Sequence, residues 1–176
     1  MKIKDITAIA LMSAIICILS PFSLPIGPIP LSISTIAVYL SAGLLGKNKG
    51  TMAVLIYILL GAVGLPVFSG FTGGIQKLFG VTGGYIIGYI PCAFISGYFI
   101  TRVDEKKWLY PIGMILGTLA CYALGTLWFM VQANVNLLPA LSTCVIPFIP
   151  GDIIKIIAAT AIIYPLRKTL KPSINI

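Results

Sequence analysis

Residues 147–166 read PFIPGDIIKIIAATAIIYPL. This stretch has the length of about 20 residues that an α-helix needs to cross the hydrocarbon core of a membrane, and nearly all of its side chains are apolar. The exceptions include Asp152 and Lys155, which are three positions apart. Since residues three apart on a helix face the same way, both charges can point into one pocket and partly neutralise each other. The stretch therefore predicts a membrane-spanning helix that carries a functional polar site.

The whole chain shares this apolar character. Of its 176 residues, 59 % are hydrophobic and 9 % are charged, and the mean hydropathy is +1.07. That composition leaves too little polar surface for a soluble protein of this size. Apolar runs that approach the length of a span occur at residues 6–22, 31–45, 51–66, 83–101, 108–131 and 145–166. We expect an all-α protein of the cell membrane, with one domain over residues 1–176 built as a compact bundle of six transmembrane helices.

Basic residues mark every second connection between these runs. They precede the first run and follow the second, fourth and sixth, at Lys2, Lys4, Lys47, Lys49, Arg102, Lys106, Lys107, Arg167, Lys168 and Lys171. The alternate connections carry only Lys77. The positive-inside rule therefore places both termini in the cytoplasm. The net charge of +8 is interpreted as a topology signal and not as a nucleic-acid-binding face, because the basic residues form several short clusters.

The sequence lacks the patterns of several other classes of site. It has no histidine, and its four cysteines are widely spaced without a CxxC pair, so neither a zinc site nor a disulfide scaffold is indicated. It also lacks a GxxxxGKS/T phosphate loop, so we do not expect the chain to hydrolyse ATP alone. No metal and no cofactor are expected, and the cysteines are interpreted as small buried thiols.

The pair Asp152 and Lys155 has more than one interpretation. Asp152 follows Pro-Gly, where a helix would start, so its carboxylate could cap that helix, and the ion pair could serve only to lock helices together. Capping does not explain Lys155, because an ammonium near a helix N-terminus opposes the helix dipole and must find an acceptor. Lysine offers donors and aspartate offers acceptors, so together they suit a small molecule with a carbonyl beside NH groups. We favour this ligand-binding interpretation.

The connections assigned to the outside are rich in proline or glycine. Residues 21–30, PFSLPIGPIP, favour a stiff extended or turn structure, because proline prevents regular helix. Residues 65–89, LPVFSGFTGGIQKLFGVTGGYIIGY, are apolar, and their glycines let the backbone turn sharply and approach a ligand. We interpret this second connection as a loop that covers a pocket.

Aromatic side chains lie in or near these loops and helix ends. Phe71, Tyr85, Tyr122 and Trp128 could line an apolar sleeve around a ligand, although Trp and Tyr also anchor helices at the membrane interface. Gln76 is a polar candidate in the second loop, where ordinary solvation is the alternative.

Four segments together resemble the BioY family, the biotin-specific substrate-binding subunits of energy-coupling factor transporters. They are GLPVFSGFTGG at 64–74, GVTGGYIIGY at 80–89, LGTLWF at 124–129 and PFIPGDIIKIIAA at 147–159. The likeness covers nearly the whole chain and rests on the order of the motifs, the six-helix pattern and the final GDxxK. It implies a non-enzymatic subunit that captures biotin from outside, works with a transmembrane coupling subunit and two cytoplasmic ATPases, and topples in the membrane to release the vitamin inside.

The resemblance also implies roles for particular residues. Asp152 and Lys155 would engage the ureido ring of biotin, and the glycine-rich loop over residues 70–84 would close over the site. The predicted substrate-binding residues are Asp152, Lys155, Tyr85, Gly73, Gly74, Phe71, Gln76 and Trp128. Ala10 and Ala14 match the family's AxxxA motif and would contact the coupling subunit, whereas their spacing alone indicates only close helix packing.

Two other functions remain open from the residues themselves. A membrane enzyme could use Asp152 and Lys155 as acid and base, but such an enzyme usually has further titratable groups inside the membrane. A homo-oligomeric channel could pack through the glycine spacings, but a channel needs polar faces along several helices, and these runs are almost wholly apolar. Biotin capture is the preferred function.

Overall fold

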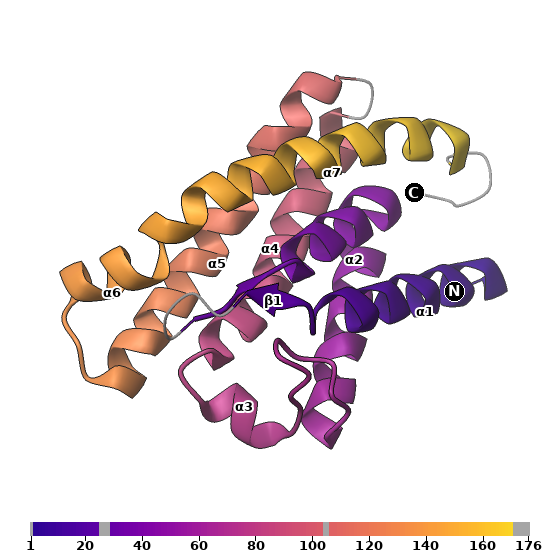
Figure 1. The fold of residues 1–176 in the computed structure, drawn as a ribbon. Coiled ribbons are helices and arrows are strands. Elements are labelled where there is room, and N and C mark those ends of the chain that lie inside the picture. Colours follow the sequence, from indigo (N-terminus) through magenta and orange to yellow (C-terminus); the bar gives the residue numbers. More distant parts are fainter. Residues whose placement is uncertain (1, 25–28, 104–105, 171–176) are drawn as a thin grey trace.

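The protein is an all-α bundle in the computed structural model, which describes residues 2–24, 29–103 and 106–170 (Figure 1). Its α-helices are α1 (Ile3–Leu19), α2 (Ser34–Val63), α3 (Ile75–Phe79), α4 (Gly83–Val103), α5 (Tyr110–Ala133), α6 (Leu137–Cys144) and α7 (Ile149–Leu170). Two short 3₁₀ helices are η1 (Lys107–Leu109) and η2 (Ile146–Phe148). Two short strands, β1 (Ser23–Leu24) and β2 (Leu31–Ser32), pair antiparallel.

Helix α2 contains two of the six expected helices. At Gly46 the backbone leaves helical geometry, with φ 76° and ψ 178°, a conformation that glycine adopts without a steric penalty. The two parts, residues 34–45 and 47–63, pack closely beside the kink, where Ser41 Oγ donates to the carbonyl of Gly50 over 3.2 Å. The six-helix prediction is therefore confirmed by α1, the two parts of α2, α4, α5 and α7, although the turn between the second and third helices is shorter than expected.

The helices differ in how far they could reach across a membrane. Among the described residues, Gly83–Val103, Lys107–Ala133 and Leu137–Thr169 are long and apolar enough to cross one by length and composition. Helix α1 has 17 residues, and each part of α2 is shorter than the roughly 20 residues of a full span. The first part of α2 begins only at Ser34, and the paired strands β1 and β2 precede it. Because this helix starts late, the space before Ser34 is available to a cavity at that end of the bundle.

Glycines allow α4 and α5 to pack closely. A Cβ atom on Gly88 would lie 2.9 Å from the Sγ of Cys121, and one on Gly117 would lie 2.7 Å from the carbonyl oxygen of Cys92. Real Cβ atoms are not found at such distances, so larger residues would push the two helices apart. The contact fixes the helices that form one wall of the cavity.

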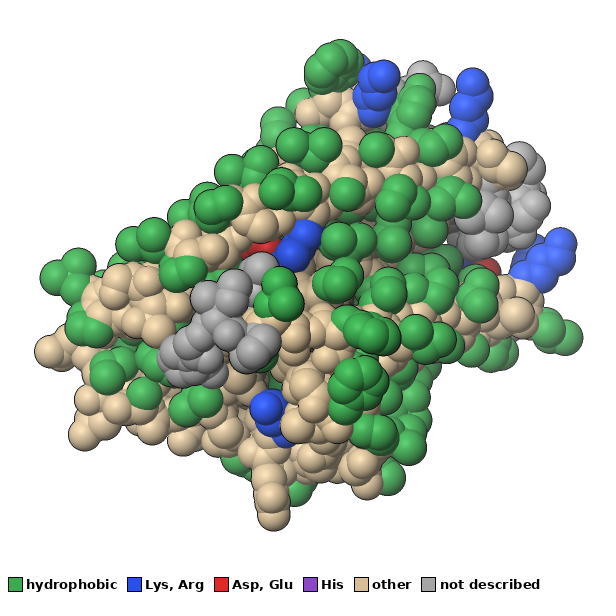
Figure 2. Space-filling model, in the orientation of Figure 1, with side chains coloured by type: hydrophobic (Ala, Val, Ile, Leu, Met, Phe, Trp, Pro, Cys, Tyr) green, Lys and Arg blue, Asp and Glu red, His purple; other side chains and the backbone are tan. Residues whose placement is uncertain are grey.

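Many basic side chains gather at the end of the bundle where α1 begins and α7 ends, whereas Lys77 on α3 and Lys155 in the first half of α7 lie away from it (Figures 1 and 2). Lys49 forms an ion pair of 2.8 Å with Asp5, which joins the kink of α2 to α1. Buried Arg167, in the last turn of α7, donates from Nη1 to the carbonyl oxygen of Gly43 over 2.6 Å. The alternation of charge in the sequence thus corresponds to one positively charged end, and its assignment to the cytoplasm stays a prediction.

Candidate functional site

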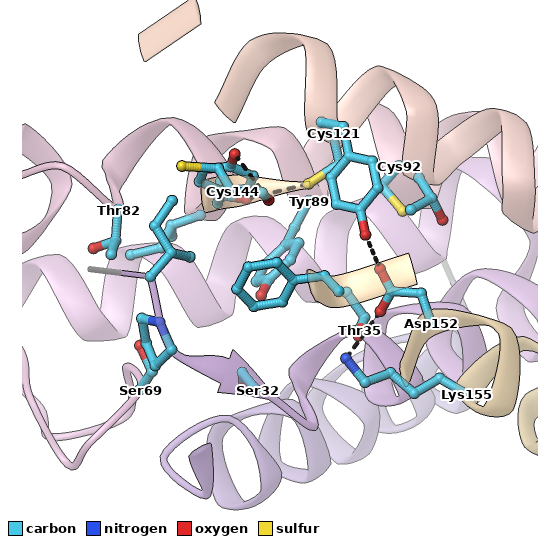
Figure 3. Close-up of a pocket in the computed structure, with 17 residues that line it drawn as sticks. Ser32, Thr35, Ser69, Thr82, Tyr89, Cys92, Cys121, Cys144, Asp152 and Lys155 are labelled. Atoms are coloured by element: carbon cyan, nitrogen blue, oxygen red, sulfur yellow. Dashed lines mark hydrogen bonds and ion pairs between the residues drawn. The ribbon is translucent and has the colours of Figure 1, made fainter. Parts of the chain in front are cut away.

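A cavity lies at the end of the bundle where α2 and α7 begin, beside β2 and the glycine-rich connection. Its wall combines the β2 region, the start of α2, the first half of α4, the middle of α5, the end of α6 and the start of α7 (Figure 3). It is lined by Ile29, Pro30, Ser32, Thr35, Ser69, Thr82, Tyr85, Ile86, Tyr89, Cys92, Thr118, Cys121, Tyr122, Cys144, Phe148, Asp152 and Lys155. Asp152 and Lys155 are the charged residues of this lining.

The charged pair is buried and held from two helices. Lys155 Nζ lies 2.9 Å from Asp152 Oδ1, and the two residues are 9 % and 7 % exposed. The hydroxyl of Tyr122, on α5, donates to the other carboxylate oxygen, Oδ2. Figure 3 shows Asp152 and Lys155 pointing toward one another on one side of the cavity. The arrangement gives the carboxylate one partner on each oxygen and gives Lys155 one acceptor.

The start of α7 explains why both charges reach the cavity. The helix begins at Ile149, directly after η2, so Asp152 lies in its first turn and not at its N-cap. A carboxylate in the first turn is stabilised by the helix dipole, whereas an ammonium one turn later is not, and Lys155 depends on Asp152 or a ligand for its acceptor. The three-residue spacing places both side chains on the same face, as the sequence predicts.

Neutral polar groups lie beside the pair. The hydroxyl oxygen of Thr35 is buried and has no hydrogen-bond partner among the described residues, and Figure 3 places Thr35 next to Asp152 and Lys155. Ser32, also in the cavity lining, is 2.5 Å from the hydroxyl of Ser34, which in turn contacts Tyr89 over 2.7 Å. A buried hydroxyl without a partner costs free energy, so Thr35 is available to a polar ligand atom.

The donor and acceptor capacity of this corner defines what it can bind. An ammonium has three donors, and Asp152 uses one of those of Lys155, so two remain. Each carboxylate oxygen of Asp152 accepts one described side-chain hydrogen bond and keeps further lone-pair capacity. The corner can therefore donate to a carbonyl and accept from neighbouring NH groups of one small molecule.

The rest of the cavity is largely apolar. The ring of Tyr85 packs against Gly125, where any side chain would overlap it, and its hydroxyl lies 3.2 Å from the hydroxyl of Thr126. Cys92, Cys121 and Cys144 also line the cavity as free thiols, as the sequence predicts for small buried cysteines. Such a surface suits a hydrocarbon ring or chain. No group of three potential metal ligands occurs among the described residues.

Three of the predicted substrate-binding residues line the cavity, namely Asp152, Lys155 and Tyr85. Phe71 does not line it, but it lines a neighbouring groove that shares Lys155 and Ser32 with the cavity. Its backbone has φ 56°, which is unusual for a bulky residue, and its ring packs edge-on against Phe22 with 5.5 Å between centroids.

The remaining predicted residues belong to the glycine-rich connection or to its support, outside the cavity lining. Gly74 has φ 97° at the N-cap of α3, and Gly73 approaches the carbonyl of Leu65 so closely that a Cβ atom would collide with it. Gln76 is exposed on α3. Trp128 Nε1 donates to the carbonyl oxygen of Gly80 over 2.9 Å. These contacts position the loop, and direct binding by these residues stays a prediction.

The predicted set omits several residues that the structure brings to the charged pair. Tyr122 is 30 positions from Asp152 and was suggested by the sequence only as one of several aromatic lining candidates. Thr35 and Ser32 come from the start of α2 and from β2, and neither occurs in a recognisable motif. Predicting these residues would require knowing that α2 and α5 approach α7, and no local sequence pattern shows this.

Comparison with known proteins adds independent information. A family model described as the BioY family matches residues 1–172. The biotin transporter BioY of Thermotoga maritima is 38 % identical over 94 % of this chain and 96 % of its own length. The probable biotin transporter BioY of Pyrococcus horikoshii is 39 % identical over 95 % of this chain and 97 % of its own.

A solved structure is similar as well. It is the crystal structure of the S-component for biotin from an ECF-type ABC transporter. Its TM-score is 0.87 at 34 % sequence identity, and the match covers 94 % of this chain and 92 % of that one. The likeness thus extends over nearly the whole chain.

Proposed function

This chain belongs to the BioY family and is a multi-pass membrane transporter for biotin, the S-component of an ECF-type ABC transporter, and we propose that the cavity beneath the start of α7 is its biotin site. Its role is substrate capture and not catalysis. Membership of the family identifies biotin as the ligand. The geometry of the cavity supports an assignment of individual residues to parts of biotin.

The buried pair of Lys155 and Asp152 is the observation that carries the site assignment. The ureido group of biotin has one carbonyl and two NH groups, so Lys155 can donate to the carbonyl while Asp152 accepts from an NH. Tyr122 holds the second carboxylate oxygen, and Thr35 offers a further hydroxyl, which has no partner in the described part of the chain. Such charge-assisted hydrogen bonds in a buried site are stronger than neutral ones.

The apolar remainder of the cavity accommodates the rest of the molecule. Tyr85, Cys121 and Cys144 provide surface for the sulfur-containing ring and the hydrocarbon chain. The glycine-rich connection then acts as a cover. The amide of Gly70 donates to the carbonyl oxygen of Pro21 over 2.9 Å, which joins this connection to the proline-rich one. Closure over bound biotin by residues 70–84 is part of the proposal.

We also propose which energising partners complete the transporter. A transmembrane coupling subunit and two cytoplasmic ATPases would complete the transporter, in keeping with the lack of a phosphate loop in this chain. Ala10 and Ala14 are exposed on α1, and small side chains there allow a partner helix to approach closely. This face of α1 is our candidate contact with the coupling subunit.

Calorimetric titration of biotin into the detergent-purified protein tests the ligand assignment, with thiamine as a vitamin of different shape for comparison. We expect saturable binding of biotin and none of thiamine. Well-folded protein that does not bind biotin, or that binds both vitamins equally, would refute the assignment.

A further inference from the structure

A second pocket lies at the opposite end of the bundle, between the kink of α2 and the last turn of α4. Its lining includes Lys47, Lys49, Tyr98 and Arg102 and shares no residue with the biotin cavity. Three of these four side chains are cationic, and no acidic residue lines this pocket in the described part of the chain. The pocket therefore has the charge to hold an anion.

The cations in the pocket differ in how they are neutralised. Lys49 forms its 2.8 Å ion pair with Asp5. Lys47 and Arg102 instead contact the ring of Tyr98, with the Nζ and Cζ atoms 5.1 Å and 5.0 Å from its centroid. Neither makes a salt bridge with any described acidic residue. A cation–π contact with a shared ring does not neutralise two positive charges, so an anionic group is favoured there.

The surroundings of the pocket identify the kind of anion. Phe94, Tyr98 and Arg102 follow one another at four-residue spacing on α4 and so lie on one face of the helix. Phe94 is 43 % exposed, and Lys47 Nζ also lies 5.7 Å from its ring. In a protein that spans a membrane, this face presents an aromatic surface to acyl chains and positive charge at the level of the lipid headgroups.

We propose that this pocket binds the phosphate group of an anionic phospholipid from the adjoining leaflet, which the positive-inside rule assigns as the cytoplasmic one. Lys47 and Arg102 contact the phosphate, while the rings of Phe94 and Tyr98 lie along the first part of an acyl chain. The N-terminus of the second part of α2 begins at the same place and adds positive potential. Basic pockets between membrane helices on the cytoplasmic side are suited to such headgroups.

Native mass spectrometry of the detergent-purified full chain tests the proposal. Phosphatidylglycerol and phosphatidylcholine are titrated separately into the wild type, the Arg102→Gln variant, and the Lys47→Gln/Arg102→Gln double variant. Lys77→Gln is the matched control, because Lys77 lies on α3 at the other end and outside the pocket. Biotin titration of each preparation checks folding, since neither Lys47 nor Arg102 lines the cavity.

We expect the wild type and Lys77→Gln to bind phosphatidylglycerol more tightly than phosphatidylcholine, and the double variant to lose roughly tenfold or more of that affinity while still binding biotin. The affinity of the Arg102→Gln variant for phosphatidylglycerol should lie between those of the wild type and the double variant. Equal binding of the two lipids, or an unchanged affinity in the double variant, would overturn the proposal. Inorganic phosphate that displaces the lipid at equal concentration would show that the pocket selects free phosphate, which would also overturn the lipid assignment.

Discussion

Replacing Lys155 by alanine is the sharpest test of the biotin site. The substitution removes the ammonium that lies 2.9 Å from Asp152 and leaves that carboxylate, 7 % exposed, with Tyr122 as its described partner. Hydrogen bonds to charged groups contribute about 1.5–3 kcal/mol each, and a buried charge without its mate carries an additional penalty. We expect biotin binding to weaken by about 2 kcal/mol or more, which is about 30-fold in Kd.

The measurement is calorimetric titration of biotin into purified protein, accompanied by thermal unfolding without ligand. Lys168→Ala is the matched control, since it makes the same change on the same helix at an exposed position near the other end. The control should bind as the wild type does. Wild-type affinity in Lys155→Ala would refute the reasoning, because the only ammonium that the described residues bring to the cavity lining would then contribute nothing to binding.

A double substitution separates ligand binding from a purely structural role. If the ion pair only locks α7 in place, replacing both members with Asp152→Asn and Lys155→Ala should recover much of the stability and the affinity that Lys155→Ala loses, since no buried charge is left unpaired. If the pair holds the ureido group, stability should recover while biotin binding stays weak. Recovery of both would support the structural role and contradict the site assignment.

Further predictions concern the support of the pair, the partner surface and the inner end of α7. Tyr122→Phe removes the donor to Asp152 and should weaken biotin binding by about 1 kcal/mol in the same titration, and an unchanged Kd would exclude Tyr122 from the site. Leucine at both Ala10 and Ala14 should leave biotin affinity unchanged but abolish copurification with the coupling subunit, because bulky side chains on this exposed face keep a partner helix away; full copurification would contradict the assigned interface. Arg167→Met deletes a buried donor to α2 and should lower the free energy of unfolding by about 1–3 kcal/mol in chemical denaturation with little change in Kd, whereas unchanged stability would argue against this contact.

Hydropathy and charge were sufficient to predict the bundle. The apolar runs correspond to α1, the two parts of α2, α4, α5 and α7, because a membrane requires long apolar helices whatever their later packing. The kink at Gly46 was less predictable, since the sequence suggested a longer connection there. A single glycine with positive φ reverses the chain within α2, and short-range patterns do not distinguish this from a loop.

The site was predictable only where its residues are neighbours in the sequence. Asp152 and Lys155 are three apart on one helix, so helical geometry alone brings them together, and two charges inside an apolar run stand out because their burial is costly. Five of the other predicted residues, Gly73, Gly74, Phe71, Gln76 and Trp128, lie outside the cavity lining. Their motifs indicate a tight, glycine-dependent loop, but they do not specify which of its atoms face a ligand.

The sequence by itself determined that this chain is a six-helix membrane protein with one buried ion pair, since both conclusions follow from the composition and spacing of neighbouring residues. Only the tertiary structure decided that Tyr122 and Thr35 complete the polar corner and that Lys47 and Arg102 share one pocket. These residues meet because glycines permit close helix contacts and because α2 reverses at Gly46. Such long-range contacts depend on how the helices pack, which the local hydrophobic pattern does not specify.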